Sequence, residues 1–271
     1  MQNKLVDIIV SCYNEENNIL PFFNEIIKYL NDDKYIYNIV YVNDGSIDRT
    51  YEEIIKAKDK LENEIRQGNI KLSVISFDKN YGHEAAMCAG IYNSKADYMI
   101  VIDADLQNPP SKIPSIMKKF EEGADCVLLR RVKYGSVGFL KKITSRGYYL
   151  FSKYILQNKN YRDVSDFFAL DSELAKKVIS KYHTRLRFVR SFVQNESHNI
   201  MVVDYESMPR HSGVTRYNYR VLLRLAAISE LSRIKFLRDK FVPSIENPIY
   251  KIDKNKTQYA FCDNAQLKDG V

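Results

Sequence analysis

The sequence has no Cys-x-x-Cys pair and no signal peptide ahead of its four cysteines, Cys12, Cys88, Cys126 and Cys262. Widely spaced cysteines without a leader are typical of reduced thiols in a cytoplasmic protein. Long apolar runs are missing as well: residues 8–10 and 99–102 are strand-sized, whereas a membrane-spanning helix needs about 18 apolar residues. We therefore expect a cytoplasmic chain that meets the inner face of the membrane only peripherally.

Two phosphate-binding signatures are also missing. No Gly-x-Gly-x-x-Gly follows the first apolar run, which argues against a nicotinamide dehydrogenase. The N-terminal glycine-rich phosphate loop that a nucleotidyltransferase would carry is not found either. Internal repeats and low-complexity tracts do not occur, so the chain is not a repeat protein.

What is present is an ordinary globular composition. With 271 residues, 45% of them hydrophobic, the chain can form one large α/β domain or two small ones. Lys and Arg outnumber Asp and Glu by 41 to 34, for a formal net charge of +7. This excess favours anionic partners such as nucleotides, lipid phosphates or nucleic acid. A basic module that binds nucleic acid or anionic membrane is the non-enzyme alternative.

Strand-like and helix-like patterns alternate along the first half of the chain. The strand patterns cover residues 5–10, 38–42, 70–77 and 98–102, and helical patterns follow at 18–30, up to about 66, and from about 84. This alternation predicts a mainly parallel sheet flanked by helices, with ligands at the carboxyl ends of the strands. Acidic and polar loops follow these strands, which argues for an enzyme and against a simple nucleic-acid-binding module.

The second half is less regular. We expect a helix from about residue 111, strands at 126–129, 167–170 and 200–205, a helix from 172, and a further element at 185–193. Residues 135–157 follow helical spacing with aromatic and basic side chains, among them Lys141, Lys142 and Arg146. Such a helix lies in the interface of an anionic membrane or packs on the protein's own core. Residues 1–236 would form the main domain, and residues 237–271 a polar tail, loosely ordered from residue 251.

Asp103-Ala104-Asp105-Leu106-Gln107 follows directly on an apolar strand. Two carboxylates and an amide oxygen at a strand end are hard ligands that suit Mg²⁺ or Mn²⁺. A divalent ion held there can bind a diphosphate and stabilise its charge as a leaving group. Because most Asp-x-Asp pairs are solvated turns, the position after a buried strand carries this hypothesis.

Other strand ends carry residues suited to a nucleotide. Ser11, Tyr13 and Glu15 follow the first strand, where a tyrosine ring can stack on a base. Asp44 follows the second strand and can accept hydrogen bonds from a base or ribose, although a plain tight turn at Gly45 is the simpler interpretation. Residues 209–217 look like a mobile loop in which Arg210 and Arg216 could clamp a diphosphate. Asp166, expected just before a strand, is our candidate for contact with the acceptor.

With these residues assembled, the sequence resembles family 2 glycosyltransferases of the GT-A fold, most of all the branch of dolichyl-phosphate mannose synthase and bacterial polyprenyl-phosphate glycosyltransferases. The resemblance runs from about residue 6 to residue 236. It rests on Ser-Cys-Tyr-Asn-Glu-Glu-Asn-Asn-Ile, Val-Asn-Asp-Gly-Ser-Ile-Asp-Arg-Thr, Asn-Tyr-Gly-His-Glu-Ala-Ala-Met-Cys-Ala-Gly, Asp-Ala-Asp-Leu-Gln-Asn-Pro-Pro, Ser-Asp-Phe-Phe-Ala-Leu-Asp and the loop from Arg210 to Tyr217. Ser11 replaces the family's usual proline, and Asn43 with Asp44 replaces its paired aspartates, which leaves the base open.

The resemblance implies a role for each matching residue. The nucleotide-sugar would contact Ser11, Tyr13, Glu15, Asp44, Asp103, Ala104, Asp105, Arg130, Arg210 and Arg216, and the metal would contact Asp103, Asp105 and Gln107. Asp105, Asp166 and Arg210 would take part in catalysis. The implied activity is inverting transfer of a hexose from a UDP- or GDP-sugar. A lipid phosphate and a glycan hydroxyl remain alternative acceptors, a homo-oligomer remains open, and no nucleic acid is expected as a partner.

Overall fold

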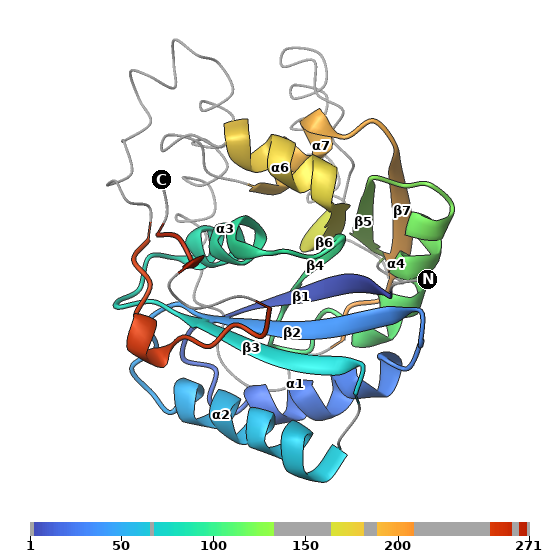
Figure 1. The fold of residues 1–271 in the computed structure, drawn as a ribbon. Coiled ribbons are helices and arrows are strands. Elements are labelled where there is room, and N and C mark those ends of the chain that lie inside the picture. Colours follow the sequence, from blue (N-terminus) through green and yellow to red (C-terminus); the bar gives the residue numbers. More distant parts are fainter. Residues whose placement is uncertain are drawn as a thin grey trace, which may run out of the picture.

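The computed structural model describes residues 3–65, 68–132, 164–181, 189–208, 250–261 and 266–269. Its described strands form a seven-stranded sheet in the order β3-β2-β1-β4-β6-β5-β7 (Figure 1). Their bounds are β1 (Lys4–Cys12), β2 (Tyr35–Asn43), β3 (Ile70–Ser76), β4 (Tyr98–Asp103), β5 (Cys126–Arg131), β6 (Val164–Asp171) and β7 (Ile200–Tyr205). All neighbouring pairs are parallel except those of β6, which runs antiparallel to β4 and β5. The predicted mainly parallel α/β sheet is confirmed.

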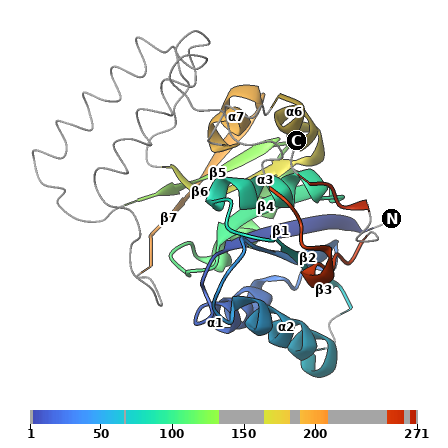
Figure 2. The same cartoon turned by 90° about the vertical axis from the view of Figure 1, so that its left-hand side faces the viewer.

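Helices cover both faces of the sheet (Figures 1 and 2). The described α-helices are α1 (Ile19–Ile26), α2 (Thr50–Lys60), α3 (His83–Asn93), α4 (Ile113–Glu121), α6 (Ser172–Lys181) and α7 (Val189–Glu196). One apolar core joins α1, α2 and α4 to one face, and a second joins α3, α6 and α7 to the other. The central strand β1 is buried from Val6 to Cys12, as expected of a parallel strand covered on both sides.

The described C-terminal residues pack onto the sheet beside β3 (Figure 2). Val74 bridges to Gln258 and Phe77 to Ile252, both antiparallel, and the Phe77 and Tyr250 rings stack with centroids 4.9 Å apart. The expectation of a loosely ordered tail is therefore wrong for these residues. The polar composition suggested disorder, but the backbone groups at the edge of β3 can form hydrogen bonds with the backbone of a polar segment as well.

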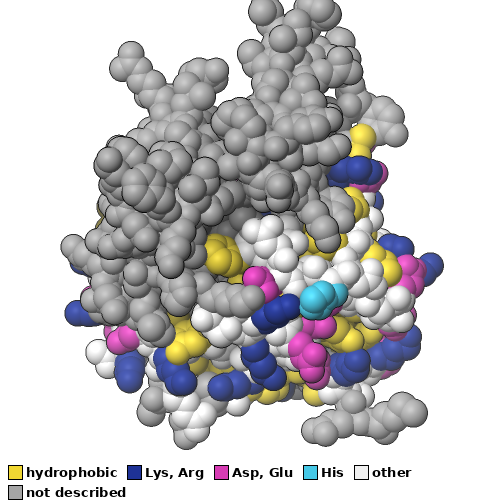
Figure 3. All heavy atoms as spheres, turned by 90° about the horizontal axis from the view of Figure 1, so that it is seen from above, with side chains coloured by type: hydrophobic (Ala, Val, Ile, Leu, Met, Phe, Trp, Pro, Cys, Tyr) yellow, Lys and Arg dark blue, Asp and Glu magenta, His cyan; other side chains and the backbone are white. Residues whose placement is uncertain are grey.

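The surface of the described part carries charges of both signs. Seen from above, Lys and Arg side chains lie among Asp and Glu side chains (Figure 3), so the basic excess is not gathered on the described part of this face. Within the described ranges, none of the helices has the length and apolar character that crossing a membrane requires.

Candidate active site

The carboxyl ends of β1, β2 and β4 bring distant parts of the sequence together. Ser11 of β1 pairs with Asp103 of β4, and Cys12 pairs with Asn43 of β2. Since these strands are parallel neighbours, the loops that follow them open at the same edge of the sheet, where ligands of such folds bind. The sequence prediction that these loops share one edge is confirmed.

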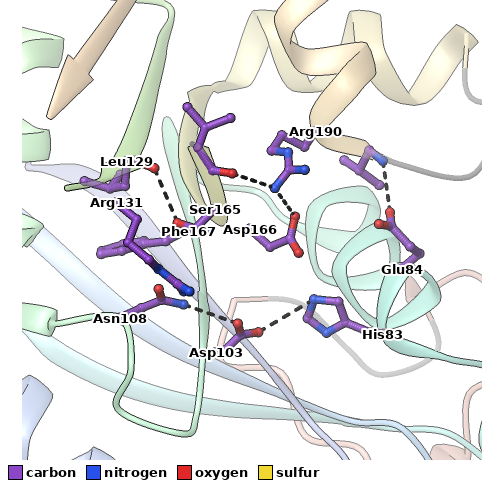
Figure 4. A network of polar contacts seen from close by, with 12 residues as sticks. His83, Glu84, Asp103, Asn108, Leu129, Arg131, Ser165, Asp166, Phe167 and Arg190 are labelled. Carbon is purple, nitrogen blue, oxygen red and sulfur yellow. Dashed lines mark hydrogen bonds and ion pairs between the residues drawn. The ribbon is translucent and has the colours of Figure 1, made fainter. Parts of the chain in front are cut away.

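Asp103 is the centre of a polar network at this edge (Figure 4). Its carboxylate accepts a hydrogen bond from Asn108 Nδ2 at 3.2 Å and lies 3.6 Å from His83 Nε2. Ser11 Oγ lies 2.9 Å from His83 Nδ1 and 3.5 Å from Asp103 Oδ1. Asn108 is in turn held by the Tyr205 hydroxyl at 2.7 Å. The network fixes the Asp103 carboxylate from several sides while leaving its side chain 33% exposed.

His83 stands among acidic side chains at the start of α3. Burial lowers the pKa of its imidazole, but the nearby carboxylates of Asp103, Asp166, Glu84 and Asp44 outweigh burial, and the pKa is raised. A histidine in this setting favours its charged form more than an isolated one does. The site therefore places beside Asp103 a histidine whose protonated form is favoured by its acidic neighbours.

The Asp103–Gln107 turn is built by an unusual backbone. Leu106 has a positive φ of 61°, and Asp105 Oδ1 accepts the Gln107 backbone N–H at 3.0 Å. Ala104 and Asp105 are almost buried, at 2% and 6% exposure. Short Asx-type hydrogen bonds of this kind stabilise a tight turn, and the turn keeps both carboxylates and the Gln107 amide in one short loop.

Asp44 is buried at 2% exposure and tethers a neighbouring loop. It accepts the backbone N–H groups of Tyr81 and Gly82, at 2.6 and 2.9 Å, and the Asn80 amide at 2.9 Å. Burial raises the pKa of Asp44 to about 6, although the two N–H groups act to lower it. Three donors use most of the roughly four acceptor positions of a carboxylate. Asp44 therefore holds the loop that leads to His83, and its contact with a base stays a proposal.

The first two loops are also joined to each other. The Asn14 N–H donates to Ser46 Oγ at 3.0 Å, and the Glu15 N–H donates to Thr50 Oγ1 at 2.8 Å. Tyr13 and Glu15 are half-buried in this joint. Both side chains are thus placed on a braced loop beside the strand ends rather than on a free one.

Asp166 belongs to β6, which lies on the side of β4 opposite to β1. Val101 of β4 is paired with Phe168 of the antiparallel strand β6. Asp103 comes two residues after Val101 and Asp166 two residues before Phe168, so both carboxylates reach the same edge (Figure 4). Asp166 Oδ1 lies 2.7 Å from Arg190 Nη1. The expectation that Asp166 precedes the strand is wrong, because β6 begins at Val164, where it pairs with Arg130 of β5.

A known sequence family matches this chain. The model described as "Glycosyl transferase family 2" matches residues 7–179, more than half of the chain and the span that carries Ser11, Asp103 and Asp166. The chain belongs to glycosyl transferase family 2. It is accordingly a glycosyltransferase, and the carboxyl edge of its sheet is the candidate active site.

Individual relatives agree with this assignment. The bactoprenol glucosyl transferase of Shigella phage SfV is 30% identical over 223 residues, which cover 82% of this chain and 69% of that protein. The putative glycosyltransferase CsbB of Bacillus subtilis is 30% identical over 222 residues, covering 82% and 64%. An uncharacterized glycosyltransferase of Synechocystis, sll0501, is 29% identical over 221 residues, covering 82% and 67%. The chain thus spans about two thirds of the curated relatives.

Solved structures support the fold. Glucosyl-3-phosphoglycerate synthase from Mycobacterium tuberculosis, in complex with Mn²⁺, UDP-glucose and phosphoglyceric acid, has a TM-score of 0.56 at 16% identity, covering 89% of this chain and 81% of that one. Staphylococcus aureus TarS 1–349 in complex with UDP has a TM-score of 0.51 at 18% identity, covering 74% of this chain and 58% of that one. At these identities the likeness shows the GT-A-like fold alone.

Some predicted site residues of this family 2 glycosyltransferase lie away from the polar network around Asp103, and others lie outside the described residues. Arg130 lies on β5, separated from β4 by β6, and forms a two-bond ion pair with Asp204 at 2.7 and 2.8 Å. Both side chains are 48% exposed, so the pair contributes little to stability, and the phosphate contact of Arg130 stays a prediction. Arg210, Arg216 and the helix expected at residues 135–157 lie outside the described residues, and their roles stay predictions.

Three residues of the network were missed by the sequence analysis: His83, Asn108 and Arg190. His83 is one of four histidines and follows a strand through a short Asn-Tyr-Gly loop, a signal that could have found it. Asn108 sits one residue beyond the expected metal-binding turn. Arg190 has no local signal, because its partner Asp166 is 24 residues away.

Proposed function

We propose that this enzyme transfers a sugar, with inversion, from a UDP- or GDP-sugar to a lipid phosphate of the polyprenyl type at the cytoplasmic face of a membrane. The observation that carries the proposal is the convergence of Ser11, Asp103 and Asp166 at one sheet edge. Relatives named bactoprenol glucosyl transferase support the choice of a lipid acceptor.

The donor side fits a divalent cation. Asp103 is partly exposed and braced, and Asp105 and Gln107 lie in the same turn. Among the described residues no three His, Cys, Asp or Glu side chains form a metal cluster; the ligand set that we propose is two carboxylates and one amide oxygen. Mg²⁺ or Mn²⁺ bound there would supply charge stabilisation for the departing diphosphate. Arg130, Arg210 and Arg216 would add cations for the phosphates, and Tyr13 a face for the base.

The acceptor would attack the anomeric carbon from the face opposite the nucleotide, which inverts the configuration in one displacement. A phosphate monoester with a second pKa near 6 is largely ionised at neutral pH, so its oxygen needs no strong base. In this version Asp166 orients the acceptor.

Transfer to a glycan hydroxyl in cell-surface polysaccharide synthesis is the second candidate. It is favoured by the Asp166 carboxylate, which is 39% exposed at the edge beside Asp103. A hydroxyl acceptor must lose its proton during attack, and Asp166 would then act as the general base. The two candidates differ in how much activity an Asp166→Asn variant keeps.

A thermal-shift comparison tests the donor half of the proposal. We expect a UDP-sugar or a GDP-sugar to raise the melting temperature strongly only when Mn²⁺ is present, because the ion links the diphosphate to Asp103 and Asp105. A pure binding module should show no metal-dependent shift. Equal shifts with and without Mn²⁺ would contradict metal-dependent donor binding.

Vesicle binding tests the membrane half. The basic residues Lys141, Lys142 and Arg146 lie outside the described residues, and we propose that they draw the enzyme to anionic lipid at roughly 1 kcal/mol per charge. The protein should sediment with anionic vesicles at low salt, and replacing the three residues with Glu should release it. If the triple variant still sediments and transfers normally, the segment packs on the protein and a soluble glycan becomes the better acceptor.

A further inference from the structure

The ion pair between Asp166 and Arg190 lies at one side of the candidate site (Figure 4). Arg190 Nη1 lies 2.7 Å from Asp166 Oδ1 and also donates to the Val164 carbonyl at 3.2 Å. The side chain of Arg190 is 30% exposed and that of Asp166 is 39% exposed. The pair lies at the edge of the sheet that also carries Asp103 (Figure 4). An arginine held by a backbone carbonyl as well as a carboxylate has a fixed orientation.

The helix that carries Arg190 is itself anchored to the donor side. Glu84, in the first turn of α3, accepts the Val189 backbone N–H at 2.9 Å, and thereby caps α7 at its first residue. His83, next to Glu84, contacts Asp103 and Ser11. A chain of direct contacts therefore runs from the strand ends of the donor side through α3 and α7 to Asp166.

The ion pair reduces the electrostatic repulsion between Asp166 and the anionic acceptor of the proposed reaction. A lipid phosphate carries between one and two negative charges at neutral pH, and an isolated Asp166 carboxylate would repel it. A guanidinium in contact with Asp166 balances that charge and also fixes the rotamer of the carboxylate. Arg190 Nη1 makes both the contact with Asp166 and the hydrogen bond to the Val164 carbonyl.

We propose that Arg190 is a positioning residue of the acceptor side, which holds the Asp166 carboxylate in place and balances its charge so that an anionic acceptor can approach. The inference rests on the proposed function, in which Asp166 faces the acceptor. It assigns to α7 a task beyond packing, because the helix delivers Arg190 to β6.

A double-mutant cycle with Asp166→Asn and Arg190→Gln tests this assignment. The readout is kcat/KM for polyprenyl phosphate at saturating donor, together with the donor KM. We expect Arg190→Gln to lower kcat/KM by about tenfold or more and to leave the donor KM within about twofold. In the Asp166→Asn background the same change should cost less than about threefold, because no carboxylate remains to be held. Arg190→Lys, which keeps the charge, should fall between wild type and Arg190→Gln.

Lys34→Ala is the matched control. It removes an ion pair of 2.9 Å with Glu121 in which both side chains are well exposed, and it should keep wild-type rates. Melting temperatures of all variants report whether the fold is intact. Should Arg190→Gln not fold, Arg190→Lys goes through the same cycle, and its effect must again shrink without Asp166.

The outcomes separate this inference from the function on which it rests. Equal losses from Arg190→Gln in both backgrounds would show that Arg190 acts independently of Asp166 and would overturn the inference alone. Wild-type rates for Arg190→Gln would do the same. An Asp166→Asn variant with wild-type rates would overturn the acceptor-side role of Asp166, and the inference with it.

Discussion

Ser11 and Asp103 occupy paired positions at the ends of the neighbouring parallel strands β1 and β4, and Ser11 Oγ lies 3.5 Å from Asp103 Oδ1. The strand register brings together two residues that are 92 positions apart in the sequence. Because each sits where its strand ends, both groups are fixed by the sheet and still reach the ligand edge. A preorganised carboxylate at this point suits the metal-bound diphosphate that we propose as the donor group.

Asp105→Asn should abolish sugar transfer and leave the fold intact. The amide oxygen can still accept the Gln107 N–H, as Asp105 Oδ1 does at 3.0 Å, but the negative charge for the metal is lost. Turnover of the sugar nucleotide with Mn²⁺ is the measurement, and Asp59→Asn, at an exposed carboxylate on α2, is the control. A rate within about threefold of wild type, less than 1 kcal/mol in the barrier, would remove Asp105 from the metal site.

Asp44 should make the stability of the fold depend on pH. Its pKa is raised from 3.8 to about 6 in the folded protein, so the folded state binds more protons than the unfolded state between these values. The stabilising contribution of Asp44 is then fully present below about pH 4 and is lost as the pH rises through about 6. The difference in unfolding free energy between wild type and Asp44→Asn should shift by on the order of 3 kcal/mol from pH 4 to 7.

Urea unfolding of both proteins at several pH values measures this difference. The comparison cancels the other titrating groups, because they are common to the two proteins. A difference that does not change with pH would mean that Asp44 has an ordinary pKa in the folded state.

Gly45→Ala should be far more damaging than Gly123→Ala. Both glycines have positive φ, 62° and 94°, but a Cβ at Gly45 would lie 2.2 Å from the Lys79 carbonyl carbon, whereas nothing lies within 4 Å of one at Gly123. Backbone strain alone costs about 1 kcal/mol, and a clash with backbone adds to it. Melting temperatures test the difference, and similar losses for the two variants would show that the loops adjust freely.

Tyr259→Phe should weaken the attachment of the C-terminal residues. The Tyr259 hydroxyl donates to Asp7, a carboxylate with 0% exposure that also accepts from Ser94 and Asn38. Removing one donor from a buried carboxylate costs about 1–3 kcal/mol. Urea unfolding measures the loss, with Tyr51→Phe as the control, since the Tyr51 ring keeps its contact with Lys256 without the hydroxyl. Equal stabilities would mean that this segment does not support the sheet.

Much of the fold follows from local pattern. The apolar runs and turn residues of the first 103 positions predict β1 to β4 and their helices within a few residues, because each strand is buried on both faces and each loop begins with polar residues. The reversed direction of β6 and the packing of residues 250–261 depend on long-range pairing. No local pattern encodes such pairing.

The candidate site, too, could be predicted only in part from the sequence. Asp103 and Asp105 could be found because they follow directly on a strand. The contacts that Ser11 and His83 make with Asp103 could not, because they join residues from three different segments through the strand register and the packing of α3. Asp44 shows a further limit: its position at a strand end was predicted, but its three hydrogen bonds to residues 80–82 depend on the tertiary fold.

The central claim is transfer to a phosphate on a lipid, and one assay tests it directly. The enzyme is supplied with a labelled UDP- or GDP-sugar, Mn²⁺ and either polyprenyl phosphate or the matching polyprenol in anionic vesicles. The account predicts a labelled lipid-linked sugar phosphate from the first acceptor and no product from the second. Labelled polyprenol, or no labelled product from polyprenyl phosphate, would contradict it.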